Sequence, residues 1–131
     1  MNRSRGWWLF GVLLALALVA CGPRARAPLK VVERDSGAMI ELRVGEQIEL
    51  VLDANPSTGY NWEVAGEVKV VKLVGEPQFT PDSKALGAGG KMTMRFQTVA
   101  PGEEWLRVVY RRSWEEGVAP EKMFELYIVV K

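Results

Sequence analysis

The stretch "IELVLDANPSTGYNWEV", residues 48–64, contains two alternating apolar segments separated by a break. Apolar residues occupy every second position from Ile48 to Leu52, and again from Tyr60 to Val64. Side chains two positions apart lie on the same face of a β-strand, so each segment predicts a strand with one face in the core. The Asn-Pro-Ser-Thr-Gly between them favours a tight turn, because proline fixes its own φ and glycine accepts a positive φ.

The same period of two continues through the rest of the chain, and Gly/Pro-rich turns separate the segments. We find no convincing helical period with caps after residue 21, so we predict an all-β antiparallel sandwich of about seven strands, with Trp62 packed between the two sheets. The other predicted core segments are Ile40, Leu42 and Val44; residues 69–74; Met92, Met94 and Phe96; Leu106, Val108 and Tyr110; and Phe124, Leu126, Ile128 and Val130.

The N-terminal residues have the features of an export signal. Arg3 and Arg5 precede an uncharged apolar run that ends at Ala20, which is shorter than a spanning helix requires. Leu-Val-Ala-Cys at 18–21 resembles the lipobox of bacterial lipoproteins, which implies cleavage before Cys21 and lipidation of that residue. The alternative is an uncleaved N-terminal anchor helix.

Three regions are therefore expected: a lipoprotein signal peptide at residues 1–20, a lipidated cysteine with a flexible Pro-rich tether at 21–36, and one folded domain at 37–131. The lipid would anchor the exported protein to the cell envelope. Gly22 follows the cysteine in place of the aspartate that resembles an inner-membrane retention signal, so we prefer the outer membrane, facing the periplasm.

The composition argues against several kinds of chemistry. The chain has no histidine and one cysteine, which excludes Ser-His-Asp and Cys-His centres and His-based metal sites. With 17 basic and 16 acidic residues, it carries no charge excess that would favour nucleic acid. A carboxylate pair for acid–base work stays open, but we expect no enzyme, no cofactor and no metal, and we expect a monomer.

Three stretches do not read as ordinary strand connections: residues 52–62, the glycine-rich "SKALGAGGKM" at 83–92, and "RRSWEEGVAPEK" at 111–122. The third places Trp114 among charged residues, which is typical of a binding hot spot, although the ring could instead cover the end of a sheet. Counted along a seven-strand sandwich, the three stretches fall at connections on the same end. We therefore expect them to form one preorganised binding edge.

"NPSTGY" (55–60), "GAGG" (87–90) and "RSW" (112–114) resemble the three signature loops of the chagasin family, whose patterns are Asn-Pro-Thr-Thr-Gly-Tyr/Phe, Gly-x-Gly-Gly and Arg-Pro-Trp/Phe. The resemblance extends from about residue 38 to the end of the chain. It implies an immunoglobulin-like sandwich and reversible, tight-binding inhibition of papain-like cysteine peptidases. The residues that it implies for peptidase binding are Asn55, Pro56, Ser57, Thr58, Gly59, Tyr60, Gly87, Ala88, Gly89, Gly90, Arg112 and Trp114.

In the mechanism implied by this resemblance, the 55–60 segment enters the active-site cleft with Thr58 nearest the catalytic cysteine, while the other two loops contact the sides. Two positions depart from the patterns. Ser57 in place of threonine keeps a hydroxyl, whereas Ser113 in place of proline loosens its loop and puts the affinity in doubt.

Other readings stay open on the sequence alone. The same loops could make a lipid-anchored module that binds another envelope protein or a glycan, with Trp114, Glu115 and Glu116 as sugar contacts. A structural lipoprotein with incidental loops is a further alternative, and an enzyme is the least favoured.

Overall fold

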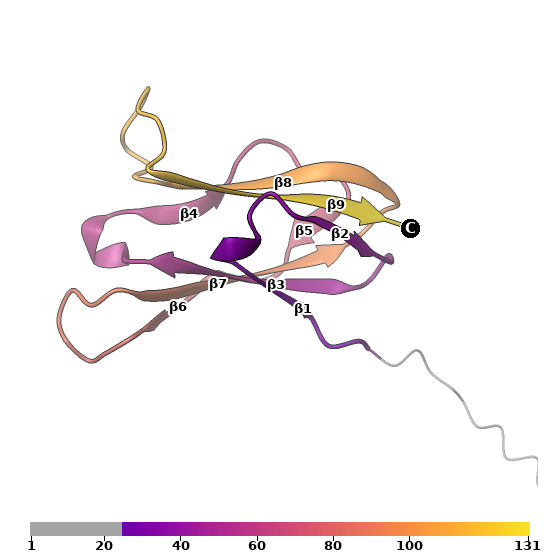
Figure 1. The fold of residues 1–131 in the computed structure, drawn as a ribbon. Coiled ribbons are helices and arrows are strands. Elements are labelled where there is room, and N and C mark those ends of the chain that lie inside the picture. The colour runs from indigo at the N-terminus through magenta and orange to yellow at the C-terminus, as the bar shows by residue number, and fades with distance from the viewer. Residues whose placement is uncertain (1–24) are drawn as a thin grey trace, which may run out of the picture.

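The structure, a computed structural model, describes residues 25–131 and shows two β-sheets packed face to face (Figure 1). One sheet has five strands in the order β1-β3-β7-β5, with β6 also paired to β7, and the other has four strands in the order β2-β9-β8-β4. The elements are β1 (Leu29–Val32), η1 (Glu33–Asp35), β2 (Met39–Leu42), β3 (Gln47–Ala54), η2 (Pro56–Thr58), β4 (Asn61–Val64), β5 (Val71–Leu73), β6 (Gln78–Pro81), β7 (Gly90–Thr98), β8 (Gly102–Arg111) and β9 (Lys122–Val130).

The core lies between the sheets and is made by the alternating residues of the long strands. Leu50 and Phe96 from one sheet and Leu126 from the other are fully buried. Trp62 is 4% exposed, as expected, and its indole Nε1 donates a hydrogen bond to the carbonyl of Asp53 at 2.9 Å. The predicted all-β sandwich and its core are thus confirmed.

Two predicted core residues are exposed, namely Val44 and Leu73, the latter 38% exposed at the end of β5. Val44 is 48% exposed, because β2 ends at Leu42 and Val44 lies in the turn that follows. Its amide donates to the carbonyl of Lys131 at 3.3 Å, so the backbone at this point contacts the C-terminus while the side chain faces solvent.

The expectation of purely antiparallel pairing was wrong. Strand β1 runs parallel to β3, and β2 runs parallel to β9. The N-terminal segment passes from one sheet to the other through η1, so β1 and β2 each add a strand to one edge of a different sheet. The described chain contains nine strands, of which β1 and β6 were not predicted.

The predicted tether was also wrong for residues 29–36. Val31 in β1 is 3% exposed and belongs to the core, and the Val32 amide donates to the Asp35 carboxylate at 2.9 Å. An apolar residue that pairs with β3 is held by burial as well as by backbone hydrogen bonds. The predicted signal peptide (1–20) and the lipidation site Cys21 lie outside the described residues.

Three connections lie at one end of the sandwich (Figure 1). We call residues 55–60, between β3 and β4, the first loop; residues 82–89, between β6 and β7, the second loop; and residues 112–121, between β8 and β9, the third loop. Residues 25–28 and the C-terminus lie at the opposite end. Within residues 25–131, neither of the two helices has the length and apolar character needed to cross a bilayer.

Candidate functional site

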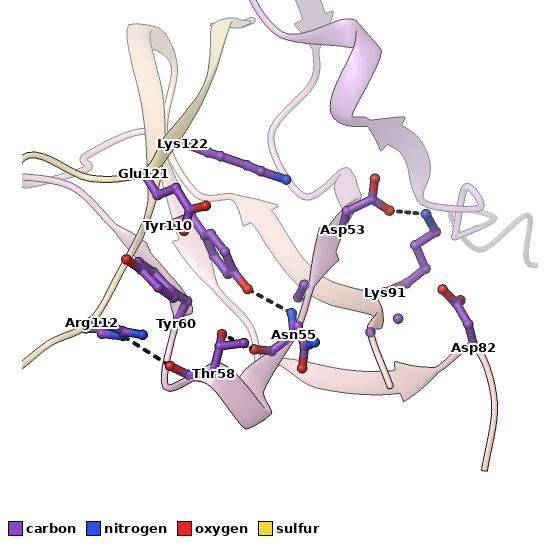
Figure 2. Close-up of a pocket in the computed structure, with 13 residues that line it drawn as sticks. Asp53, Asn55, Thr58, Tyr60, Asp82, Lys91, Tyr110, Arg112, Glu121 and Lys122 are labelled. Atoms are coloured by element: carbon purple, nitrogen blue, oxygen red, sulfur yellow. Dashed lines mark hydrogen bonds and ion pairs between the residues drawn. The ribbon is translucent and has the colours of Figure 1, made fainter. Parts of the chain in front are cut away.

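The three loops lie together, as the sequence predicted, and the first loop contacts each of the other two directly. The Asn55 side-chain amide donates to the carbonyl of Gly87 at 3.1 Å, which joins the first loop to the second. Arg112 Nε donates to the carbonyl of Thr58 at 3.1 Å, which joins the first loop to the third. Segments separated by more than thirty residues in the chain are therefore tied together at one end of the sandwich, and Figure 2 shows the contact between Arg112 and Thr58.

The first loop is a compact turn. Pro56–Thr58 form a 3-10 helix, in which the Thr58 amide donates to the carbonyl of Asn55 at 3.1 Å and the Gly59 amide to the carbonyl of Pro56 at 2.9 Å. The Thr58 hydroxyl donates to the same Asn55 carbonyl at 2.6 Å. Gly59 then has φ 83°, a left-handed conformation that glycine adopts without steric cost and that turns the chain into β4. The predicted tight turn is confirmed.

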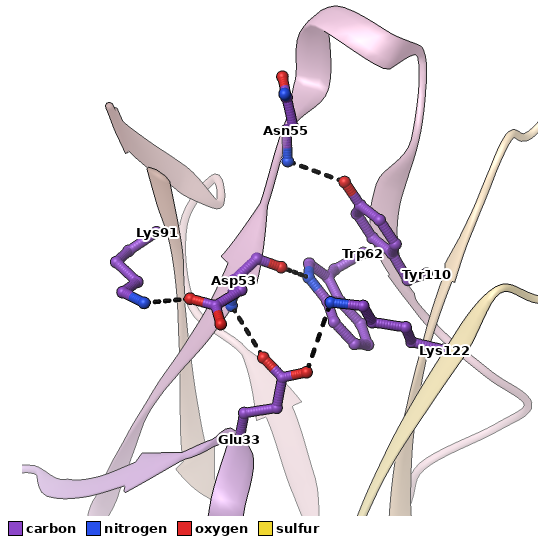
Figure 3. Close-up of polar contacts among 7 residues, drawn as sticks. All are labelled: Glu33, Asp53, Asn55, Trp62, Lys91, Tyr110 and Lys122. Atoms are coloured by element: carbon purple, nitrogen blue, oxygen red, sulfur yellow. Dashed lines mark hydrogen bonds and ion pairs between the residues drawn. The ribbon is translucent and has the colours of Figure 1, made fainter. Parts of the chain in front are cut away.

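Asn55 joins the first loop to its surroundings through both its side chain and its backbone. Its side-chain oxygen accepts a hydrogen bond from the Ser57 hydroxyl. Its backbone amide donates to the Tyr110 hydroxyl at 2.8 Å, which ties the start of the loop to β8 in the opposite sheet (Figure 3). The bonds to Tyr110 and Gly87 both leave the first loop, so Asn55 fixes the position of the loop.

Tyr110 was predicted only as a core residue, and its role in the loop was missed. It is 6% exposed, and its ring stacks on Tyr60 with centroids 5.3 Å apart. The alternating pattern identifies Tyr110 as inward-facing. The sequence signal that could have found its role is the hydroxyl, because a buried tyrosine usually bonds a partner.

The third loop packs its aromatic residue on the first. The Trp114 side chain is 67% exposed, yet a Cβ placed on Gly59 would lie 2.3 Å from Trp114 Cη2. The indole therefore rests on the backbone of Gly59, with most of its surface facing solvent. This arrangement combines the two readings of Trp114, since the ring covers a neighbouring loop and still presents an apolar face.

The Arg112 side chain is directed toward the first loop. Its guanidinium lies over the Tyr60 ring with 4.4 Å between Cζ and the ring centroid, and its Nη1 donates to Glu115 Oε1 at 3.0 Å. The hydrogen bond to Glu115 raises the pKa of Arg112 above its usual value. Together with the bond to Thr58, these contacts use two of the five guanidinium N–H groups and one face of the guanidinium.

The glycines in and beside the second loop differ in their burial and in their backbone contacts. Gly87 presents its carbonyl to Asn55, and Gly89 packs near the carbonyl of Ala54, at 3.6 Å from an ideal Cβ. Ala88 is half-buried beside them. Gly90 is buried, and a Cβ there would lie 2.1 Å from the carbonyl of Thr80. The structure therefore places Gly90 against β6, its neighbour in the same sheet, where it allows two backbones to approach. It contributes to the wall of the site and not to the exposed tip of the second loop.

A hollow of about 670 Å³ opens beside the first loop (Figure 2). Lys91 on its wall donates to the Asp53 carboxylate, and this hydrogen bond holds the pKa of Asp53 below its usual value. Glu33 of η1 accepts from the Asp53 amide at 3.3 Å and lies 3.6 Å from Lys122 (Figure 3). The residues lining the hollow are Asp53, Ala54, Asn55, Thr58, Tyr60, Asp82, Gly89, Gly90, Lys91, Tyr110, Arg112, Glu121 and Lys122.

Several charged groups in and beside this hollow already have partners within the protein. Asp53 pairs with Lys91, Lys122 with Glu33, and Arg112 with Thr58. Such an arrangement stiffens the base of the loops. Their tips carry Ser57, Thr58 and Trp114, a small polar wedge beside an exposed aromatic ring. This surface is suited to filling a groove on another macromolecule.

Comparison with known proteins agrees with this geometry. Residues 41–128 match the family model described as "Chagasin family peptidase inhibitor I42". Chagasin from Trypanosoma cruzi is 33% identical over 104 residues, which cover 76% of this chain and 94% of chagasin.

Solved structures show the same immunoglobulin-like fold. The crystal structure of a cysteine protease inhibitor from Entamoeba histolytica matches with a TM-score of 0.69 at 21% identity, covering 79% of this chain and 95% of that one. The structure of PbICP-C in complex with falcipain-2 matches with a TM-score of 0.52 at 20% identity, covering 79% and 98%. These relatives are inhibitors and not enzymes, and with a family model matching most of its length the chain belongs to the chagasin family of peptidase inhibitors.

Proposed function

We propose that this protein is a reversible, tight-binding inhibitor of papain-like cysteine peptidases, which blocks the active-site cleft with its three adjacent loops. The observation that carries the proposal is the convergence of the three loops, tied by Asn55 to Gly87 and by Arg112 to Thr58. Family membership supports the class of target, and one neighbour of the same fold was solved in complex with falcipain-2.

The first loop is the part that would enter the cleft. A peptidase cleaves a peptide that it holds extended with its carbonyl in line with the nucleophile. Residues 56–58 are instead wound into a 3-10 turn whose carbonyls at Asn55 and Pro56 already accept internal hydrogen bonds. The loop therefore fills the site around Thr58 without offering a bond in the right geometry for attack.

The other two loops would contact the walls of the cleft. The second loop presents backbone groups around Gly87, Ala88 and Gly89, and the third presents the indole of Trp114. Because the loops are already tied together in the free protein, little conformational entropy is lost on association, which favours tight binding.

The glycan-binding alternative receives less support from the geometry. A sugar site at Trp114 would use neighbouring carboxylates to bind hydroxyl groups. The Glu115 carboxylate is instead engaged by Arg112 at 3.0 Å, so it is directed into the loop and away from the exposed ring face.

For the cellular setting, we propose an exported monomer anchored to the envelope through lipid on Cys21, with the outer membrane facing the periplasm as the preferred site. Residues 25–28 lie at the end of the sandwich opposite to the three loops (Figure 1). A chain anchored on that side would direct its binding loops away from the membrane.

The test is a steady-state inhibition assay of papain with residues 22–131. We expect competitive, one-to-one inhibition that is reversed by dilution, with the inhibitor recovered uncleaved. Trp114→Ala should weaken inhibition, whereas Trp105→Ala, a 41% exposed tryptophan on β8 outside the loops, should not. An absence of inhibition at micromolar concentrations against papain and several related peptidases would contradict the proposal.

A further inference from the structure

The third loop contains a turn, residues 112–115, that has no proline to restrict its backbone dihedral angles. The Glu115 amide donates to the carbonyl of Arg112 at 3.1 Å, so residues 112–115 form a β-turn with Ser113 and Trp114 at its centre. Proline is favoured at the position of Ser113, because it fixes the φ that such a turn requires. Serine does not fix φ, so something else must hold Trp114 in place.

The side chains at the two ends of this turn are linked to each other. Arg112 Nη1 and Glu115 Oε1 are 3.0 Å apart, and the two side chains are only 35% and 29% exposed. The first and last residues of the turn are therefore joined twice, by a backbone hydrogen bond and by an ion pair between their side chains.

The same guanidinium reaches the first loop. Arg112 Nε donates to the carbonyl of Thr58 at 3.1 Å while the guanidinium stacks over Tyr60 at 4.4 Å. Glu115 therefore orients a side chain that itself fixes the backbone at Thr58. Two of the five guanidinium N–H groups and one face of the guanidinium are used in this way.

We propose that Arg112 and Glu115 form a clamp that holds the third loop on the first, and that this clamp replaces the rigidity that a proline at position 113 would supply. Both are positioning residues: they keep Trp114 packed on Gly59 and do not themselves bind the target. The effect of the clamp on inhibition rests on the proposed function, but its effect on the free loops does not.

The clamp predicts a particular kinetic signature. If it is removed, a smaller fraction of free molecules has the loops correctly placed, and the apparent affinity falls in proportion to that fraction. Such a loss appears mainly in the association rate constant. Loss of a direct contact would instead raise the dissociation rate constant.

The first experiment uses the free protein and needs no peptidase. In Glu115→Ala, we expect the backbone ¹⁵N order parameters of Gly59 and Trp114 to fall from about 0.85 toward 0.6, the range of flexible loops. Glu116→Ala is the matched control, since Glu116 is exposed and forms no ion pair within the described residues. Order parameters in Glu115→Ala equal to those of the wild type would overturn the clamp.

The second experiment is a rescue. Glu115→Ala should reduce the association rate constant for papain about fivefold, the loss expected if about one-fifth of the free molecules keep the competent arrangement. Adding Ser113→Pro should restore most of it, whereas Ser113→Pro alone should have an effect of less than about twofold, because the turn is already closed. An unchanged association rate with faster dissociation, unrescued by proline, would show that Glu115 binds the target and would overturn the proposal.

The two experiments separate this inference from the proposed function. If the wild-type protein failed to inhibit papain, the order parameters would still decide whether Arg112 and Glu115 hold the two loops together.

Discussion

The first loop and the tip of the second lie at the same end of the sandwich, yet they are held very differently. The first loop is tied to Tyr110 and Gly87 through Asn55, to Arg112 through Thr58, and to Trp114 through Gly59. Residues 83–86 at the tip of the second loop are all exposed, and the side-chain bond within them is from the Ala85 amide to Ser83 at 3.3 Å.

This difference suggests a division of roles. A segment that must enter a narrow groove gains affinity from being rigid before it binds. A flanking segment that is flexible can fit target surfaces of different shape, because its backbone can adjust to each of them. Leu86, whose side chain is fully exposed at the compliant tip, has few neighbours to constrain it. Substitutions in the first loop should therefore have larger effects than changes at the tip of the second.

The largest effect is expected for Gly59→Ala. Alanine at φ 83° is strained by about 1–2 kcal/mol, and its Cβ would displace the Trp114 ring. We expect the inhibition constant for papain to rise at least about 100-fold. Gly75→Ala is the matched control, because Gly75 has φ 71° with no atom within 4 Å of an ideal Cβ. Equal losses of inhibition in the two variants would contradict the claim that inhibition depends on the conformation of the first loop.

Trp114→Ala is expected to have the next largest effect. Truncation of a central aromatic residue in an interface costs about 2–4 kcal/mol, so the dissociation rate constant should rise about 100-fold while the association rate changes little. Surface plasmon resonance with immobilised papain measures both rates. A change confined to association would mean that Trp114 orders the loops and does not contact the target.

Tyr110→Phe tests the tie between the sheets and the first loop. Removing the hydroxyl leaves the Asn55 amide without its acceptor, which destabilises the folded position of the first loop by about 1 kcal/mol. Because fewer free molecules then have the loop correctly placed, the affinity should fall by at most about fivefold. Tyr127→Phe removes a hydroxyl that donates to Glu103 on an exposed surface and serves as the control. Isothermal titration against papain gives both affinities, and we expect only Tyr110→Phe to lower the affinity.

Insertion of two glycines between Lys84 and Ala85 tests the compliance of the second loop. The Asp82 amide donates to the carbonyl of Gly89 at 3.0 Å, so the base of the loop is closed and the insertion only lengthens the tip. We expect a loss of about 0.2 kcal/mol in stability and about twofold in inhibition. A loss as large as that of Gly59→Ala would show that the tip is rigid as well.

The smallest effect is expected at Asp53, which joins the strands that carry the first two loops by pairing with Lys91. Its folded-state pKa lies below its usual value of 3.8, because Lys91 donates to the ionised carboxylate. The pair therefore stabilises the fold above that pH, and the contribution is lost as the pH falls through the folded-state pKa. Thermal melts should show Asp53→Asn slightly less stable than the wild type at pH 7 and equal to it in strong acid; an unchanged difference in acid would contradict the pairing.

The sequence predicted the sandwich and its core because burial leaves a direct trace in the alternation. Leu50, Phe96 and Leu126 face inward, as their places in the alternating apolar pattern predicted. The three loops could be found because Gly59, Gly87 and Trp114 are unusual residues at turns. Their convergence followed from the number of strands between them. β1 precedes all three loops, and β6 runs along β7 in the same direction as β5, so neither additional strand changes the end at which the loops lie.

Other features could not be predicted, because alternation records which face is buried and not which strand is the neighbour. The parallel pairing of β1 with β3 and of β2 with β9 depends on where the N-terminal segment crosses between sheets. The role of Arg112 as a tie to Thr58 depends on a contact across 54 residues of sequence. Neither leaves a local pattern in the sequence.

The most direct test of the account is hydrogen–deuterium exchange of the free protein and of its complex with papain, followed by mass spectrometry. The account predicts that binding slows exchange in residues 55–60, 82–89 and 112–121, and leaves the turns at the opposite end, residues 43–46 and 99–102, unchanged. Protection of the opposite end, or of the outer face of β8 and β9 around Trp105 and Tyr127, with the three loops unprotected, would contradict it.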